Sequence, residues 1–318
     1  MIEYIAGELM IEKYYDVERI NKLLGANPQK VIVDTESNYR GQLFRLADDI
    51  EERGNVQVVL LAGPSCAGKT TSAKLLKEVL EKKGKHVITV SMDDFFINRA
   101  DTPFLPNGQR DYENPHTVNA KQIEECFTKL WTGQPTGFPV FDFKEGINMP
   151  NQKTLTKQDN TIVIFEGLHA LNPYIYEHLG TTNYYRVYIG SMSGFRYQDD
   201  IIDVVDLRLI RRIIRDIDTR GYSVADTLKS WDTVCDGENK YINPYREEVD
   251  YFIDTTHMYE LSVYKACILE LRARNMVSDA DFEGMPLISV VMHGTSLGKD
   301  LIPDTSLMWE FVQKPNQQ

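Results

Sequence analysis

The stretch Gly63-Pro64-Ser65-Cys66-Ala67-Gly68-Lys69-Thr70 decides the fold, because it fits the pattern G-x-x-x-x-G-K-[ST]. An apolar run at 56–62 precedes it and is typical of a buried strand, and 70–83 follow it with apolar residues at helical spacing. Glycines let main-chain N–H groups converge on phosphate oxygens, and the helix N-terminus adds its positive dipole end. The pattern predicts a phosphate-binding loop, with Lys69 against phosphate charge and the Thr70 hydroxyl on Mg²⁺. The alternative is a glycine turn that binds nothing.

Four further apolar runs, at 86–92, 161–165, 185–189 and 251–253, are typical of buried strands. Helix-like segments lie between them, and Gly84 follows the first where a C-terminal cap is expected. Strands that alternate with helices predict an α/β fold with a doubly wound, mainly parallel sheet flanked by helices. An amphipathic helix is expected at 36–54, and long loops are expected at 100–115 and 132–157.

Composition narrows the class of protein. The 318 residues are 42% hydrophobic and 26% charged, as in ordinary globular proteins. With 35 basic and 47 acidic residues the net charge is −12, which argues against nucleic acid and anionic membranes as partners. We find no apolar run of bilayer length and no basic start of a signal peptide, so a cytoplasmic protein is expected. The four cysteines are far apart, which predicts reduced thiols that mostly serve packing.

Candidate acidic groups lie at the ends of two predicted strands. A carboxylate after the second strand can orient an acceptor hydroxyl and accept its proton, and the chain offers Asp93 and Asp94 there. Only one of the two is expected to face the phosphates, and the alternative for either is a cap on the next turn. Glu166 ends the third strand, where such folds hold Mg²⁺ or its water. His169, three residues on, either touches substrate or is hydrogen-bonded to backbone.

Five arginines lie within thirteen residues, and four of them share one helical face: Arg208, Arg211, Arg212 and Arg215. In an acidic chain such a cluster makes a local positive field that can stabilise phosphoryl oxygens in a transition state. The alternative is a solvated face paired with Asp216 and Asp218. Gly221, just beyond, is typical of a hinge or helix stop and suits a lid that closes over nucleotide. No Asn-Lys-x-Asp element for guanine is present.

These motifs in this order resemble the uridine kinase branch of the P-loop kinases, which also includes phosphoribulokinase and bacterial pantothenate kinase. Residues 63–71 look like its phosphate loop, and 91–96 look like its Asp-x-Phe-Tyr element, whose first Asp, here Asp93, is the catalytic base. Residues 111–115 and 139–143 are similar to its ribose-binding and base-pocket segments, and 165–167 match its Phe-Glu-Gly strand end. The resemblance implies a P-loop NTPase fold with an Arg-rich helical lid at about 206–222, ATP as donor and Mg²⁺.

The resemblance also implies roles for single residues. It implies that Glu113 holds a ribose, that Arg212 contacts substrate, and that Arg215 and Arg220 contact ATP phosphates. It covers about 55–258, and it extends to long bacterial uridine kinase-like nucleoside kinases, which share counterparts of 219–223 and of the tail at 302–307. Those proteins carry an N-terminal domain of the threonyl-tRNA synthetase type, for which this chain lacks room.

Four departures concern the acceptor. Glu113 stands for Asp, Phe141 for Tyr, Gly146 near an expected His, and Tyr222 for an Arg. A pocket that hydrogen-bonds one base rejects analogues because unmatched buried polar groups are costly. Losing such groups favours an acceptor other than uridine.

The resulting hypothesis is an ATP-dependent phosphotransferase that acts on a primary hydroxyl of a small sugar-containing acceptor, with a pyrimidine nucleoside as first choice. Alternatives are a kinase of a sugar, sugar phosphate or pantothenate-like acid, and a non-catalytic nucleotide sensor. The expected catalytic residues are Asp93, Lys69 and Arg215, and the metal site is Thr70 with Glu166. The expected ATP-binding residues are Gly63, Ser65, Cys66, Ala67, Gly68, Lys69, Thr70, Thr71, Arg215 and Arg220, and the acceptor-binding ones are Asp93, Tyr112, Glu113, Phe141, His169 and Arg212.

The chain is thus divided into an N-terminal extension with a helix at 1–54, a P-loop kinase domain at 55–258, and a C-terminal helical extension at 259–318. The two extensions either form the interface of a homo-oligomer or cover sheet edges.

Overall fold

Five parallel strands form the central sheet, in the order β12-β9-β4-β8-β5. The structure, a computed structural model, describes residues 2–5, 9–12 and 14–314. The five strands are β4 (Val58–Ala62), β5 (His86–Ser91), β8 (Thr161–Glu166), β9 (Tyr184–Gly190) and β12 (Tyr251–Asp254). Each lies on one of the five predicted apolar runs, so the doubly wound parallel sheet is confirmed. Every residue of β4 and β8 is buried, which explains why these strands are apolar without alternation.

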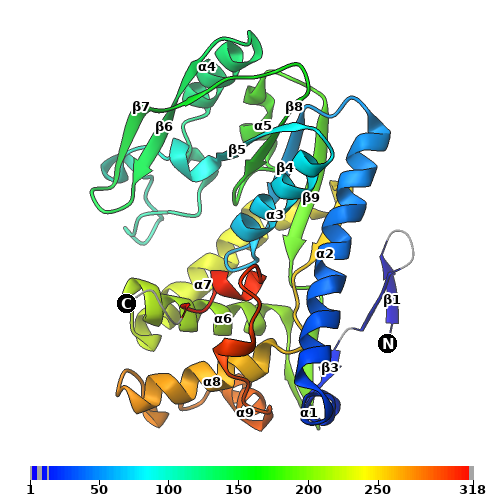
Figure 1. The fold of residues 1–318 in the computed structure, drawn as a ribbon. Helices are drawn as coiled ribbons and strands as arrows, with labels where there is room; N and C mark the ends of the chain where they lie inside the picture. The colour runs from blue at the N-terminus through cyan, green and yellow to red at the C-terminus, as the bar shows by residue number, and fades with distance from the viewer. Residues whose placement is uncertain (1, 6–8, 13, 315–318) are drawn as a thin grey trace.

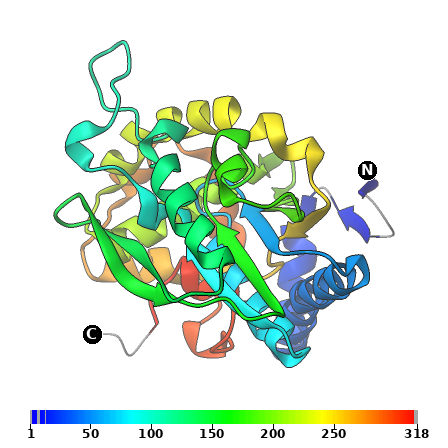
Figure 2. The same cartoon turned by 90° about the horizontal axis from the view of Figure 1, so that it is seen from above.

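Helices cover both faces of the sheet (Figures 1 and 2). Val59 and Leu61 of β4 belong to one buried cluster, which includes residues of α2 (Pro28–Arg53) and α3 (Lys69–Lys82). Val58 and Leu60 belong to a second cluster on the other face, which includes residues of α4 (Ala120–Trp131) and α5 (Pro173–Tyr176). Alternate residues of one strand therefore stabilise two separate layers of helices.

Glycines in left-handed conformation end both long helices on the first face. Gly84 has φ +81°, and the next amide, that of Lys85, donates to the Leu80 carbonyl at 3.1 Å, so the predicted cap is confirmed. Helix α2 ends at Gly54 with φ +72° and starts at Pro28, where the Asn27 side chain accepts from a backbone N–H. It is thus longer than the helix expected at 36–54.

The expectation of a loop over 132–157 was wrong. The segment forms an antiparallel hairpin of β6 (Thr136–Asp142) and β7 (Ile147–Leu155), which packs beside α4 (Figure 2). The Asp142 carboxylate accepts the amides of Lys144 and Glu145, and Gly146 closes the turn at φ +72°. Strand β7 is mostly exposed and polar, so it lacks the alternation by which a strand is recognised. The 100–115 stretch is irregular and projects from the molecule, as expected.

The remaining elements flank the carboxyl end of the sheet (Figure 1). Helices α6 (Val204–Arg215) and α7 (Val224–Tyr241) precede β12, and α8 (Glu260–Ala273) and α9 (Pro286–His293) follow it, in agreement with the helical pattern expected after residue 255. At the N-terminus lie the hairpin of β1 (Ile2–Ile5) with β2 (Leu9–Glu12), strand β3 (Tyr14–Asp16) and α1 (Val17–Ala26). Strand β3 pairs in parallel with β10 (Gly194–Tyr197), which pairs with β11 (Asp200–Ile202).

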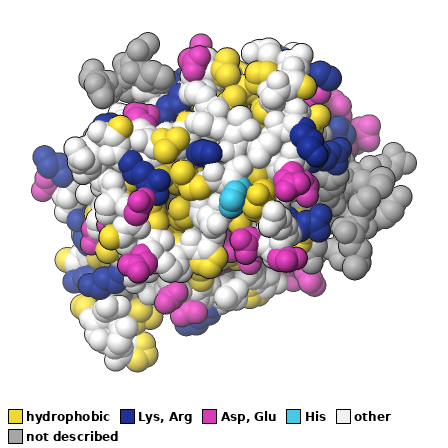
Figure 3. Space-filling model, turned by 90° about the horizontal axis from the view of Figure 1, so that it is seen from below, with side chains coloured by type: hydrophobic (Ala, Val, Ile, Leu, Met, Phe, Trp, Pro, Cys, Tyr) yellow, Lys and Arg dark blue, Asp and Glu magenta, His cyan; other side chains and the backbone are white. Residues whose placement is uncertain are grey.

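The surface carries charges of both signs. On the face drawn in Figure 3, basic and acidic side chains are interspersed, with apolar atoms between them. The basic residues of this face therefore form no single positive field of the kind that attracts polyanions. Within the described ranges, no helix has both the length and the apolar character that crossing a membrane requires.

Candidate active site

The phosphate-binding loop, residues 63–70, connects the carboxyl end of β4 to the start of α3. A Cβ on Gly63 would lie 2.0 Å from the Ile189 carbonyl oxygen, so the loop approaches β9 more closely than any side chain allows. Gly68 has φ +92°, and Cys66 holds φ +59° without being a glycine. Backbone strain of this kind persists where surrounding contacts impose it, commonly at ligand sites.

The loop presents donors to its concave side. Helix α3 begins at Lys69, and the first amides of a helix have no intrahelical acceptor, which leaves those of Lys69 and Thr70 for a ligand. The Lys69 ammonium donates to the Pro64 carbonyl at 2.9 Å, across the loop. The Thr71 amide donates to the Glu310 carboxylate at 3.0 Å, a contact with the C-terminal segment that the sequence did not indicate.

Two buried arginines hold the loop from behind. The Arg208 guanidinium donates to the Ser65 carbonyl at 3.2 Å and pairs with Glu238 at 2.6 Å. The Arg211 guanidinium donates to the Cys66 carbonyl at 3.2 Å, and its side chain is fully buried. Because C=O and N–H point in opposite directions in a peptide unit, the amide of Cys66 is directed away from Arg208. Sequence analysis expected both arginines in the face that stabilises phosphoryl oxygens, whereas the structure pairs them with Glu238 and Glu260 and directs them to carbonyl oxygens of the loop.

The other three arginines share one carboxylate. Asp216 is 1% exposed and lies 3.4 Å from Arg212, 2.8 Å from Arg215 and 3.5 Å from Arg220. Arg212 also donates to the Ser65 hydroxyl at 3.2 Å, which brings this cluster to the phosphate-binding loop. One carboxylate against three guanidinium groups leaves positive charge beside the loop. The alternative of pairing with Asp216 is thus correct, whereas a fully solvated face is not.

A π-helical turn, Asp216–Arg220, follows α6 and ends at Gly221, which has φ +69°. The predicted helix stop at Gly221 is confirmed. Asp218 lies in this turn but pairs with Arg274 at 3.4 Å and Lys299 at 4.0 Å, away from the arginines of α6. The turn is therefore fixed to the C-terminal part of the chain.

Asp93 and Asp94 face different neighbours. Both follow β5 in a short 3₁₀ helix, Met92–Phe95. Burial raises the pKa of Asp93, Asp94 adds to this rise, and the positive charge of Lys69 opposes it. Asp94 accepts from the Lys153 ammonium of β7 at 2.7 Å. Asp93 is thus the carboxylate on the side of the phosphate-binding loop.

Half-buried Glu113 and fully buried His169 lie close together beside α7. Burial raises the pKa of Glu113 to about 7, against the charges of Arg212 and Lys69. A Cβ on Gly237 of α7 would lie 2.4 Å from the Glu113 Cβ, so this glycine gives the helix its close approach. Burial lowers the pKa of His169 to about 4, and its Nδ1 has no hydrogen-bond partner within the described ranges. The His169 ring lies edge-on to Tyr241, 6.0 Å between centroids.

Glu166 ends β8 opposite Ser91 of β5 and is 7% exposed. Burial raises its pKa, Asp93 adds to this, and Lys69 opposes it. The carboxylates of Glu166 and Asp93 repel each other, and a divalent cation bound between them would offset this repulsion. No group of three or more His, Cys, Asp or Glu suited to a metal occurs among the residues that the structure describes. Mg²⁺ is usually bound by one or two carboxylates together with substrate phosphates.

Two further predicted acceptor residues are Tyr112 and Phe141. Tyr112 is 55% exposed, and Phe141 packs edge-to-face with Phe96 and Phe143 near the hairpin turn. Gly146, noted for replacing an expected histidine, lies in that turn with φ +72°, and a Cβ added to it would lie 2.9 Å from the Arg99 side chain, so a larger residue would be strained there.

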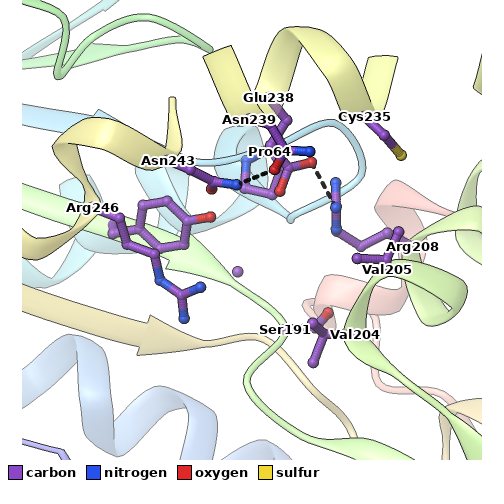
Figure 4. A pocket seen from close by; sticks show the side chains of 12 residues that line it. Pro64, Ser191, Val204, Val205, Arg208, Cys235, Glu238, Asn239, Asn243 and Arg246 are labelled. Atoms are coloured by element: carbon purple, nitrogen blue, oxygen red, sulfur yellow. Dashed lines mark hydrogen bonds and ion pairs between the residues drawn. The ribbon is translucent and has the colours of Figure 1, made fainter. Parts of the chain in front are cut away.

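A cavity lies between the phosphate-binding loop and α7 (Figure 4). Pro64 of the phosphate-binding loop and the Arg208–Glu238 pair line this cavity, together with Arg246 and Ser191. Arg208 thus connects the loop to the wall of this cavity.

Comparisons with known proteins agree with this geometry. The model of the phosphoribulokinase / uridine kinase family matches residues 58–262, well over half of the chain. A uridine kinase of Bacillus velezensis is 23% identical over 197 residues, which are 62% of this chain and 84% of that protein. A uridine kinase of Bacillus subtilis is 24% identical over 200 residues, 63% of this chain and 86% of that protein.

A solved structure from a Silicibacter species, described as a candidate fructose transport system kinase, has the same fold. It matches with a TM-score of 0.51 and 17% identity, and covers 66% of this chain and 98% of its own. The expected P-loop fold is thus confirmed. The chain belongs to the phosphoribulokinase / uridine kinase family, and is a P-loop kinase that phosphorylates a small substrate.

Proposed function

We propose that the protein transfers the γ-phosphoryl group of ATP to a primary hydroxyl of a small sugar-containing acceptor, with a pyrimidine nucleoside as first choice. The observation that carries the proposal is Asp93, a half-buried carboxylate that interacts electrostatically with Lys69 of the phosphate-binding loop while Asp94 is paired elsewhere. The relatives named uridine kinase support the nucleoside.

In this proposal the loop amides and the arginine cluster bind the triphosphate. Lys69 exchanges the Pro64 carbonyl for phosphate oxygens, and Arg215 and Arg220 stabilise the charge that develops on the transferred group. Asp93 orients the acceptor hydroxyl and accepts its proton, for which its raised pKa makes it a better base than an exposed aspartate. Mg²⁺, when held by Thr70 and Glu166, would supply charge neutralisation between phosphate oxygens.

The acceptor would lie between Glu113, His169 and Arg212. His169 is neutral at pH 7 because its pKa is about 4, so it offers a hydrogen bond without charge. Glu113, with a pKa of about 7, can accept from sugar hydroxyls in its ionised form. Tyr112 and Phe141 contribute less in this arrangement than the resemblance implies.

A second candidate is a kinase of another hydroxylated metabolite, such as a sugar, a sugar phosphate or a pantothenate-like acid. The observation that favours it is Phe141, which brings no hydroxyl and packs against other phenylalanines. A base that pairs by hydrogen bonds would find no partner there.

The experiment is a panel of nucleosides, sugars and sugar acids, with ADP release measured in the presence of Mg·ATP. Turnover with nucleosides supports the first proposal, and turnover only with another class supports the second. Mg·ATP binding without turnover on any acceptor supports a nucleotide sensor. Absence of Mg·ATP binding by calorimetry contradicts all three. The three-part division at 54 and 258, the cytoplasmic location and a homo-oligomer remain predictions.

A further inference from the structure

The C-terminal segment 302–312 lies directly on the phosphate-binding loop (Figure 1, red). Leu307 packs so closely on the loop that a Cβ on Gly68 would lie 2.7 Å from its side chain. Leu307, Met308 and Phe311 are fully buried, and the Arg211 guanidinium lies 4.5 Å above the Phe311 ring. The segment therefore packs directly against the loop, and Arg211 contacts both the segment, at Phe311, and the loop, at the Cys66 carbonyl.

The segment places a carboxylate against a backbone N–H group that is suited to bind phosphate. Glu310 accepts the Thr71 amide at 3.0 Å, and this amide belongs to the first turn of α3, whose N–H groups have no intrahelical acceptor. A carboxylate at a helix N-terminus is stabilised by the same dipole and donors that bind a phosphate. The Glu310 carboxylate thus accepts from an N–H group that would otherwise be free to bind the phosphates of a nucleotide.

Glu310 also adds negative charge to the site. Its charge contributes to the raised pKa of Glu166 and to the raised pKa of Arg215, so it lies within electrostatic range of both. A triphosphate entering the loop would meet this charge at short range and would take over the Thr71 amide. The two anions are therefore competitors for one place.

We propose that Glu310 is a built-in competitor of nucleotide phosphates, which lowers nucleotide affinity because its carboxylate has to leave the Thr71 amide when phosphate binds. This inference rests on the proposed phosphate binding by residues 63–70. It makes the C-terminal segment a determinant of the affinity for the phosphate donor, whereas acceptor binding at Glu113 is independent of it.

The test is the affinity for Mg·ADP and for inorganic pyrophosphate, measured by calorimetry on the full chain. Glu310→Gln and Glu310→Ala are each expected to bind both ligands about 10-fold more tightly than the unchanged protein, the effect of one charge-assisted hydrogen bond. Asp304→Asn is the matched control, because Asp304 is exposed on the same segment and the substitution removes the same charge. Its affinities are expected to be unchanged.

The outcomes separate the two proposals. If both Glu310 variants bind Mg·ADP no more tightly than the Asp304 variant, or more weakly, Glu310 is no competitor, while phosphate binding stands. If none of the proteins binds Mg·ADP or pyrophosphate, phosphate binding itself is refuted. In turnover assays the Glu310 variants are expected to lower the KM for ATP and leave the KM for the acceptor unchanged.

Discussion

Arg211→Met should be among the most destabilising single substitutions in this protein. All five N–H groups of the Arg211 guanidinium have acceptors: both oxygens of Glu260, the carbonyl and hydroxyl oxygens of Thr255, and the Cys66 carbonyl. Arg211 and Glu260 are both 0% exposed. Methionine fills much of the volume but leaves a buried carboxylate without its cation. Breaking a buried pair in this way costs about 3–5 kcal/mol.

The assay is urea unfolding at neutral pH, with the melting temperature as a second measure. A loss of this size should lower the melting temperature by about 10 °C in a chain of this length. Arg53→Met is the control, because the Arg53 pair with Asp250 is partly exposed and should contribute at most about 1 kcal/mol. The same substitution is thus tested in a fully buried and in a partly exposed ion pair.

A double variant tests whether the loss of stability comes from the unpaired charge of Glu260. Arg211→Met with Glu260→Gln removes the unpaired charge, so it should lose at least about 1.5 kcal/mol less than the sum of the two single variants. Arg211→Met and the double variant should both bind Mg·ADP more weakly than the unchanged protein, because the Cys66 carbonyl lacks its donor in each. A loss below about 1 kcal/mol in Arg211→Met, or strictly additive losses, would refute the reasoning.

Three further predictions concern the acceptor side. Asp93→Asn should lower turnover at least ~10²-fold, the low end for a positioned proton acceptor, whereas Asp94→Asn should lose far less; equal losses would contradict the assignment. The pKa of Glu113 in the folded protein is about 7, above its ordinary 4.5. Ionisation of Glu113 therefore lowers the free energy of unfolding as pH rises from 4.5 through 7. Glu113→Gln should therefore be more stable than the unchanged protein at pH 8, by up to about 3 kcal/mol, and nearly equal to it at pH 4.5 in urea unfolding; a constant difference would be contrary evidence. Gly237→Ala should raise the acceptor KM about 10-fold through Glu113, while Gly25→Ala, with open space around it, should not, as steady-state kinetics would reveal.

Several features were predictable because their causes are local. The five strands lie on apolar runs, and Gly84 and Gly221 end helices through their own backbone conformation. The hairpin was missed because its second strand is polar and exposed, so its pairing comes from the Asp142 turn and from contact with α4. Lys153 of this missed strand is also what distinguishes Asp94 from Asp93.

Sequence by itself determined the phosphate-binding loop, since eight consecutive residues and their two flanks contain the whole motif. It also determined that the arginines of α6 share one face, because helical spacing requires it. Only the tertiary structure decided which of them are fully buried supports, such as Arg211, and which share the Asp216 carboxylate, such as Arg215. The contact of Glu310 with Thr71 joins residues 239 positions apart. Such contacts depend on how distant elements pack, and no local pattern records that packing.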